Sequence, residues 1–175
     1  MSMLRKIVLT LSLFSSVALA NSHKQIYEDV EQKHNIPKEV LYALALTETG
    51  ITTDEGQFMP WSYTLNWRGI SYRFNSKSSA CESLEWILTV SNAVDIGETQ
   101  LHWKYHNKAT GSACDYFDRD IAINRSAEVM NDCYKKHSNW IKAAGCYHRP
   151  AGGELAKIYE MKYLTHLKNV LNQEW

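Results

Sequence analysis

The sequence has 175 residues, and its 19 lysines and arginines balance 19 aspartates and glutamates, so the formal net charge is zero. A chain without excess positive charge gives no electrostatic basis for binding nucleic acid. The length suits one domain with a hydrophobic core.

The first 20 residues have the three parts of a secretory signal peptide. Arg5 and Lys6 precede an apolar run at 7–14, and an Ala-Leu-Ala sequence at 18–20 provides small residues for cleavage. The alternative is a membrane anchor, but the apolar run is shorter than the roughly 20 residues that a span needs. We predict export to the periplasm and a mature chain, residues 21–175, that forms one domain and is not inserted in a membrane.

Two helices and a β-hairpin are predicted in the first half of the mature chain. Residues 23–34 have the spacing of a short amphipathic helix. A strongly apolar helix over 37–49 begins with proline, which the first turn tolerates, and ends before a glycine. Apolar residues alternate within 51–76 on both sides of an Arg-Gly pair at 68–69, which predicts two strands joined by a turn.

Helices dominate the second half of the chain. Ser79 and Glu82 have the spacing of a capping box and predict a helix that runs to about Val90. A glycine-containing loop is expected over 92–113. Further helices are predicted at 118–136, 138–146 and 152–172. The expected fold is a single, mainly α domain with a small β-hairpin.

The predicted mature chain contains four cysteines: Cys81, Cys114, Cys133 and Cys146. An even number in an oxidising compartment favours two disulfides, for which three pairings are possible. A turn around 136–139 would bring Cys133 near Cys146, so our hypothesis joins these two and leaves Cys81 with Cys114. Zinc is the competing explanation, but no C-x-x-C pair is present and the histidines lack the spacing of a zinc finger. No metal or other cofactor is predicted.

One carboxylic acid lies on the apolar stripe of the helix at 37–49. Leu41, Leu44, Ala45 and Glu48 follow one another at i, i+3, i+4 and i+7, which places them on one face. A helix that buries the three apolar residues points Glu48 at the core or at a cleft, where desolvation raises a carboxyl pKa. A protonated carboxyl near neutral pH is what general acid catalysis requires. The alternative is that Glu48, near the helix end, turns out to solvent.

Three short motifs resemble, in the same order, elements of the soluble lytic transglycosylases and goose-type lysozymes. ALTETG at 45–50 is similar to their E-S-G element, GETQL at 97–101 to G-L-M-Q with a following apolar residue, and AGCYH at 144–148 to the A-Y-N block. Further stretches (PWSYTLN at 60–66, VDIG at 94–97, WKYH at 103–106 and GCYHRP at 145–150) look like the specialised transglycosylases encoded beside conjugation, integrative-element and type IV secretion machinery.

This resemblance implies a lysozyme-like domain that cleaves the β-1,4 bond between N-acetylmuramic acid and N-acetylglucosamine in peptidoglycan. Glu48 would protonate the glycosidic oxygen and then accept a proton from the muramyl C6 hydroxyl, which yields a 1,6-anhydro product. Tyr147 would hydrogen-bond Glu48 and orient it, and Gln100 would bind the sugar near the cleavage point. The attacking hydroxyl is tethered to the substrate, so one acid can serve both steps, whereas ordinary glycosidases need two carboxylates.

The sequence departs from the family pattern at several positions. Glu98 and Thr99 replace the usual apolar pair, and Glu98 either points to solvent, which we favour, or brings a second carboxylate to the cleft. His102 stands where the goose-type pattern has an aspartate, which weakens the hydrolase alternative because no residue there would position water. Thr49 keeps the hydroxyl of the usual serine, and His148 replaces an asparagine.

Aromatic residues are numerous enough to form sugar-stacking platforms. Trp61 and Tyr105 are candidates because they lie in the hairpin and loop regions, whereas Trp86 and Trp140 lie on amphipathic stripes and are expected in the core. Substrate-binding or orienting roles are therefore predicted for Tyr147, Gln100, Thr49, Tyr105, Trp61 and His148, with Glu48 as the catalytic residue.

The sequence as a whole favours a periplasmic lytic transglycosylase that acts on glycan strands and makes local gaps for a conjugation or secretion apparatus. One alternative is a muramidase that hydrolyses the same bond. Another is an assembly factor that binds peptidoglycan without cutting it.

Overall fold

Helices form most of the structure, a computed structural model that describes residues 24–172. The predicted signal peptide lies outside the described residues. A helix over 24–34 is followed by α2 (Lys38–Thr49), α3 (Lys77–Leu88), α4 (Trp103–His106), the short 3-10 helix η1 (Ala113–Phe117), α5 (Arg119–His137), α6 (Trp140–His148) and α7 (Glu154–Leu171). The predicted mainly α class is confirmed, and most of the longer helices lie within a few residues of their expected bounds.

The strands form two small antiparallel sheets. β1 (Ile51–Thr52) pairs with β2 (Phe58–Met59). β3 (Thr64–Trp67) and β4 (Ile70–Arg73) form the predicted hairpin, and β5 (Val94–Ile96) and β6 (Leu101–His102) extend it to a four-stranded sheet of order β4-β3-β5-β6. Arg68 and Gly69 both have positive φ angles at the hairpin turn, as a two-residue loop with the right-handed strand twist requires.

Three details of the sequence prediction were wrong. Residues 92–113 are not a plain loop, because they contain β5, β6, α4 and the start of η1. The N-cap of α3 is Ser76, whose hydroxyl accepts the Ser79 amide, so the helix begins earlier than the capping box at Ser79 predicted. Trp86, which was expected in the core, is 60% exposed, and its ring makes an edge-on contact with that of Trp67.

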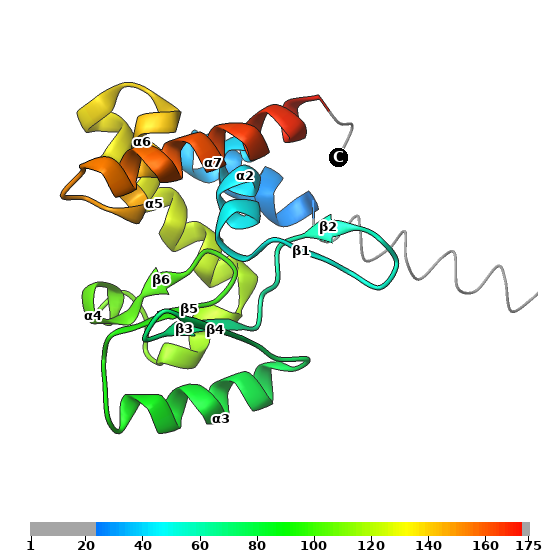
Figure 1. Cartoon of the computed structure of the whole chain (residues 1–175), viewed down its shortest axis with the longest axis vertical. Coiled ribbons are helices and arrows are strands. Elements are labelled where there is room, and N and C mark those ends of the chain that lie inside the picture. The colour runs from blue at the N-terminus through cyan, green and yellow to red at the C-terminus, as the bar shows by residue number, and fades with distance from the viewer. Residues whose placement is uncertain (1–23, 173–175) are drawn as a thin grey trace, which may run out of the picture.

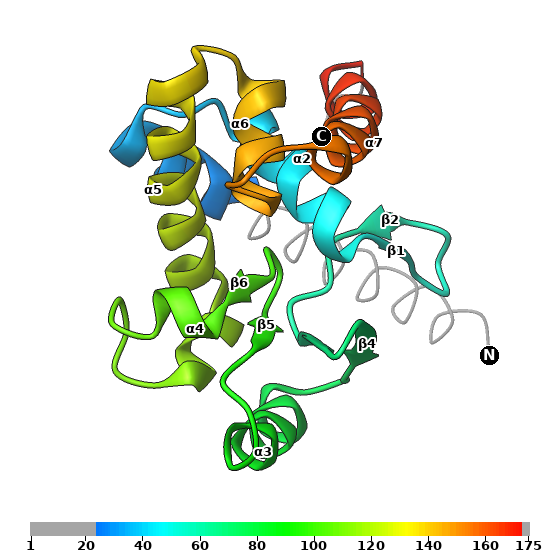
Figure 2. The same ribbon diagram turned by 60° about the vertical axis from the view of Figure 1, so that its left-hand side comes forward.

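Two hydrophobic clusters hold these elements together. The helical core lies among residues 24–34, α2, α5, α6 and α7, and includes Leu41, Leu44, Met130, Ala144 and Tyr163. The sheet core lies among the four-stranded sheet, α3 and η1, and includes Leu65, Leu84, Ile96, Leu101 and Tyr116. Figures 1 and 2 show the helical core above the sheet core, with α5 running from one to the other. Tyr147 packs against both clusters.

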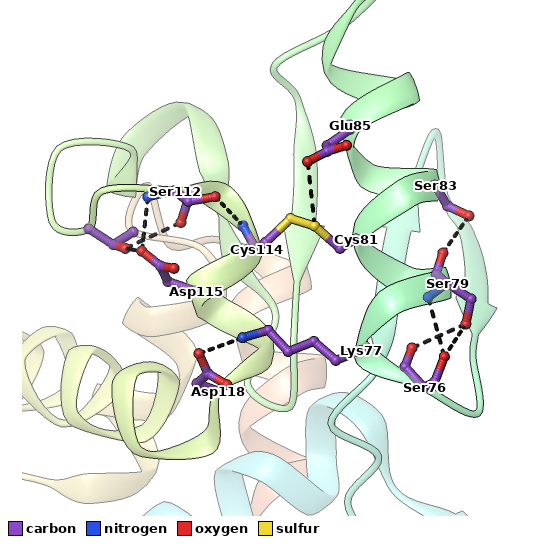
Figure 3. Close-up of a disulfide and its surroundings, with 11 residues drawn as sticks. Ser76, Lys77, Ser79, Cys81, Ser83, Glu85, Ser112, Cys114, Asp115 and Asp118 are labelled. Carbon is purple, nitrogen blue, oxygen red and sulfur yellow. Dashed lines mark hydrogen bonds and ion pairs between the residues drawn. A yellow bond between two sulfur atoms is a disulfide. The ribbon is translucent and has the colours of Figure 1, made fainter.

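Two disulfides are present, with the pairing that we favoured from the sequence. Cys81–Cys114 joins α3 to η1, and Cys133–Cys146 joins α5 to α6. Figure 3 shows the first bridge beside the Lys77–Asp118 ion pair, in which Nζ lies 2.7 Å from Oδ2. Closing loops of this length stabilises a fold by roughly 3 kcal/mol per bridge, chiefly by restricting the unfolded chain.

Across residues 24–172, none of the helices combines the length and the apolar character that crossing a membrane would need.

Candidate active site

Glu48 lies in the last turn of α2, on the face that enters the helical core. Leu41, Leu44 and Ala45 on that face are fully buried, and the Glu48 side chain is partly buried. Its Oε1 accepts a hydrogen bond of 2.7 Å from the hydroxyl of Tyr159 on α7. The sequence alternative, in which Glu48 turns out to solvent, is not what the structure shows.

The surroundings of Glu48 favour its protonated form. The pKa of Glu48 is raised to about 7. Burial and the negative charge of Asp95 raise it, whereas the hydrogen bond from Tyr159 and the ammonium group of Lys162 lower it. Burial is the largest of these effects. It raises the pKa because a carboxylate loses more hydration energy than a neutral carboxyl group. Glu48 can therefore exist in either protonation state near neutral pH, as a group that both donates and accepts a proton must.

We expect the Glu48 side-chain carboxyl carbon to titrate near pH 7 by NMR. Asp95→Asn should lower the midpoint, because it removes a negative charge that opposes ionisation of Glu48. Tyr159→Phe should raise the midpoint, because it removes a hydrogen bond that stabilises the carboxylate. Glu128→Gln, at an exposed position on α5, is the control and should leave the midpoint unchanged. A wild-type midpoint near 4.5, or shifts of the same sign in both variants, would contradict this account.

Asp95 and His102 form a carboxylate–imidazole pair on the sheet. They are direct partners in the β5–β6 register, and Nδ1 of His102 lies 2.6 Å from Oδ1 of Asp95. Burial raises the pKa of Asp95, and the contact with His102 opposes that effect. The charge of Asp95 also acts on His148 and opposes the lowering of its pKa by burial. Asp95 on the neighbouring strand therefore places a carboxylate beside position 102, where the goose-type pattern has an aspartate and this sequence has His102.

Tyr147 does not make the predicted hydrogen bond to Glu48. Its hydroxyl donates to the Thr99 carbonyl at 2.8 Å and lies 3.1 Å from the Ser126 hydroxyl. The tyrosine that contacts Glu48 is Tyr159, which sequence analysis did not single out. Burial raises the pKa of Tyr147, and the nearby charge of Glu48 raises it further, so Tyr147 lies close to Glu48 but is oriented by Thr99.

His148 covers the tyrosine that binds Glu48. Its ring stacks on that of Tyr159 with centroids 4.3 Å apart and planes inclined by 7°. Burial lowers the pKa of His148 and the charge of Asp95 opposes this. His148 therefore packs on the partner of Glu48, and the substrate-binding or orienting role predicted for it stays a prediction.

The side chain of Thr49 is fully buried and hydrogen-bonded within the protein, so it cannot contact a substrate as the sequence predicted. Its hydroxyl donates to the Glu98 carbonyl at 2.7 Å and accepts the Trp61 amide at 3.2 Å. The Trp61 indole nitrogen in turn donates to the Phe74 carbonyl at 2.7 Å. These bonds tie the end of α2 to the segment before the sheet and to the end of the hairpin.

Gln100 closes a tight turn that begins at Gly97. Gly97 has a φ of +81°, and a β-carbon there would lie 2.1 Å from the Tyr116 carbonyl oxygen, so only glycine fits. The Gln100 side-chain nitrogen donates to the carbonyls of Gly97 at 2.8 Å and Thr64 at 3.3 Å. Both amide hydrogens are engaged, which leaves the side-chain oxygen of Gln100 as the group that could accept a hydrogen bond from a ligand.

Glu98 does not face solvent, and this prediction was wrong. Its side chain is 1% exposed, and its carboxylate is bound by Arg119, with Nε 2.5 Å from Oε2 and Nη2 3.0 Å from Oε1. The hydroxyls of Tyr27 and Ser62 also donate to it. Burial would raise the pKa of Glu98, but the Arg119 guanidinium and these hydrogen bonds hold it below its ordinary value. Glu98 is therefore an ionised structural group with every oxygen occupied.

Two further features lie against the four-stranded sheet. Tyr105 is 72% exposed, and its ring lies 5.1 Å from that of His102, so it stands at the edge of the sheet beside the Asp95–His102 pair.

A separate pocket of about 450 Å³ lies between the β3–β4 hairpin and α3 and is lined largely by aromatic and aliphatic side chains, Trp67 and Trp86 among them. Glu48 does not line that pocket.

Cys81, Glu85 and Cys114 are the one group with the spacing of metal ligands within the part of the chain that the structure describes. Both sulfur atoms are joined to each other in the disulfide, so they are not free as thiolate ligands.

No protein-family model, curated protein or solved structure matches this chain.

Proposed function

We propose that the protein is a peptidoglycan lytic transglycosylase with a lysozyme-like domain, in which Glu48 is the acid–base residue. The observation that carries the proposal is the position of Glu48 at the buried end of an apolar helix face, with a pKa of about 7. An ordinary glutamic acid is almost fully ionised at neutral pH and has no proton to donate, whereas this one has both forms available. The three ordered motifs that resemble lytic transglycosylases supply the substrate class.

In the proposed reaction, Glu48 first donates its proton to the oxygen between N-acetylmuramic acid and N-acetylglucosamine, and the bond from C1 to that oxygen breaks. The Glu48 carboxylate then accepts the proton of the muramyl C6 hydroxyl as its oxygen attacks C1. The products are a 1,6-anhydromuramyl end and a free hydroxyl on the departing sugar, and no water is consumed. Because the nucleophile is part of the substrate, its effective concentration is high and one protein acid is sufficient.

Tyr159 and His148 position the acid in this scheme. The Tyr159 hydroxyl holds Oε1 of Glu48, which leaves Oε2 for the substrate, and the stacked His148 ring restricts the tyrosine. The hydrogen bond also keeps the pKa of Glu48 lower than burial alone would set it, so that the carboxylate form needed for the second step is accessible.

A muramidase is the second candidate, and the Asp95–His102 pair is the observation that favours it. A hydrolase needs a second carboxylate that activates water or stabilises the charged sugar. Asp95 interacts with Glu48 and is held by His102, so it could fill that role. Glu98, which the sequence suggested as the second carboxylate, has its oxygens occupied by Arg119, Tyr27 and Ser62.

A binder that does not cut is less well supported than either enzyme. The sequence feature that would favour it is the departure from the family pattern at Glu98 and Thr99. Both residues have internal partners, which are Arg119 for Glu98 and the Ser126 hydroxyl for Thr99. The periplasm is the proposed site of action, because the two disulfides suit an oxidising compartment and residues 1–20 resemble a signal peptide. A conjugation or secretion apparatus is the proposed partner on the strength of the motif resemblance.

Digestion of purified sacculi by residues 21–175 tests the proposal, with the released muropeptides identified by mass spectrometry. We expect 1,6-anhydromuramyl products from the wild-type protein and at least a hundredfold less product from Glu48→Gln. Glu39→Gln, at the other end of the same helix, is the matched control and should digest sacculi normally.

The other outcomes separate the alternatives. Reducing-end products that carry oxygen from labelled water, lost in Asp95→Asn, would identify the muramidase. Sacculus binding without release of products by the wild-type protein would identify the non-catalytic binder.

A further inference from the structure

One polar side chain from each strand forms a row across the four-stranded sheet. Asn66 on β3 is the register partner of both Ser71 on β4 and Asp95 on β5, and Asp95 is the partner of His102 on β6. Register partners project from the same face of a sheet, so these four side chains (Ser71, Asn66, Asp95 and His102, the polar row) stand side by side. Adjacent strands lie about 4.8 Å apart, which makes the row roughly 14 Å long.

The polar row occupies the accessible face of the sheet. The residues that alternate with it point the other way: Leu65, Ile96 and Leu101 are buried in the sheet core. Ser71 is exposed, whereas Asn66, Asp95 and His102 are partly exposed. Within residues 24–172, the side chains of Asn66 and Ser71 form no hydrogen bond, so their polar groups are free to bind a ligand.

The row leads to Glu48. The hydroxyl of Thr49, the residue after Glu48, donates to the Glu98 carbonyl at 2.7 Å, in the turn that joins β5 to β6. This bond ties the end of α2 to the strands that carry Asp95 and His102, and the charge of Asp95 acts on both Glu48 and His148. Figure 2 shows β5 and β6 directly below α6 and near the end of α2. Beyond His102, the exposed Tyr105 ring continues the row with an aromatic surface.

The chemistry of the row matches an extended carbohydrate. It presents a carboxamide, a hydroxyl, a carboxylate and an imidazole at regular intervals, and together these can donate to or accept from hydroxyl and acetamido groups. An aromatic ring at the end can pack against the apolar face of a sugar. The row has no net excess of basic groups, which argues against a phosphate or an anionic surface as the ligand.

We propose that the polar row is the binding track for the glycan strand, which crosses the β-strands from Ser71 to Tyr105 and passes Glu48 beside Asp95. This inference rests on the proposed function for the identity of the glycan. It assigns to Asn66 and Ser71 a role in binding sugars away from the scissile bond, so they affect affinity and leave the chemical step unchanged.

The test measures binding of an N-acetylglucosamine tetramer by calorimetry, with Glu48→Gln as the background so that the sugar is not cut. Asn66→Ala should weaken binding about fivefold, and Asn66→Ala with Ser71→Ala at least tenfold, because each loses a hydrogen bond to the sugar. Asn75→Ala, in the loop after β4, and Ser78→Ala, in the first turn of α3, are the matched controls, since both residues are exposed and lie outside the row. Thermal melting of each variant checks that the fold is intact.

Sacculus digestion by the same variants with Glu48 restored separates this inference from the proposed function. The track predicts a raised KM and an unchanged kcat for Asn66→Ala. If the wild-type protein digests sacculi and the row variants bind and cut like the controls, the track is overturned and the enzyme proposal stands. If the row variants bind the tetramer more weakly than the controls but the wild-type protein cuts no sacculi, the enzyme proposal is overturned and the track stands. Row-dependent binding of a free stem peptide in place of the tetramer overturns the glycan as the ligand of the row.

Discussion

Arg119→Met is expected to lower the free energy of unfolding by about 3–5 kcal/mol, because it leaves the buried Glu98 carboxylate without its cation. The two hydroxyl donors, Tyr27 and Ser62, remain but carry no net charge. Urea denaturation at pH 7 measures the change. Lys135→Met removes an exposed ion pair with Asp132 and is the control, for which little change is expected.

The pH dependence gives this prediction a second readout. Arg119 holds the pKa of folded Glu98 below its unfolded value, so the stabilisation is present above the unfolded pKa and is lost as pH falls through the folded pKa. The difference between wild type and Arg119→Met should therefore shrink in acid. A variant that is as stable as Lys135→Met at pH 7 would show that the pair contributes nothing net.

Glu48→Gln is expected to stabilise the protein above pH 7, in addition to the loss of sacculus digestion that the proposed function predicts. Folded Glu48 titrates at about pH 7 and an unfolded glutamate near 4.5, so the folded state retains a proton that the unfolded state releases between these values. The free energy of unfolding therefore falls as the pH rises between these two values. Above about pH 7, the protein bears the full free-energy cost of ionising the partly buried Glu48. Allowing for its partial exposure, this cost is on the order of 2–3 kcal/mol.

Melting temperatures at pH 5 and pH 8 measure this effect. The stability of Glu48→Gln relative to wild type should be higher at pH 8 than at pH 5. Glu39→Gln, which removes an acid from the first turn of α2, should instead be slightly destabilising, because an acid there favours the helix dipole. A pH-independent difference between Glu48→Gln and wild type would show that the pKa of Glu48 is not raised.

Local patterns predicted the parts of the site that lie within one element. The i, i+3, i+4, i+7 spacing on α2 was enough to aim Glu48 at the core, and the Arg-Gly turn was enough to predict the hairpin. The disulfide hypothesis also rested on local geometry, since a short turn joins the helices that carry Cys133 and Cys146, and the structure contains this pairing.

The contacts between distant elements were beyond these patterns. Tyr159 is 111 residues from Glu48, and Tyr27 is 71 residues from Glu98, so no spacing rule connects either pair. β5 and β6 are only three and two residues long, too short for a period of two to be recognised. Glu98 was expected in solvent, and the cation that allows it to be buried, Arg119, lies on another element.

Each disulfide lies within a single core. Cys81–Cys114 packs against the sheet core and Cys133–Cys146 belongs to the helical core, so neither crosses from one cluster to the other. Glu48 comes from the helical side and the polar row from the sheet side. A change in the distance between the acid and the row therefore strains no covalent cross-link, and the two bridges stiffen each half of the molecule without fixing the position of Glu48 relative to the row.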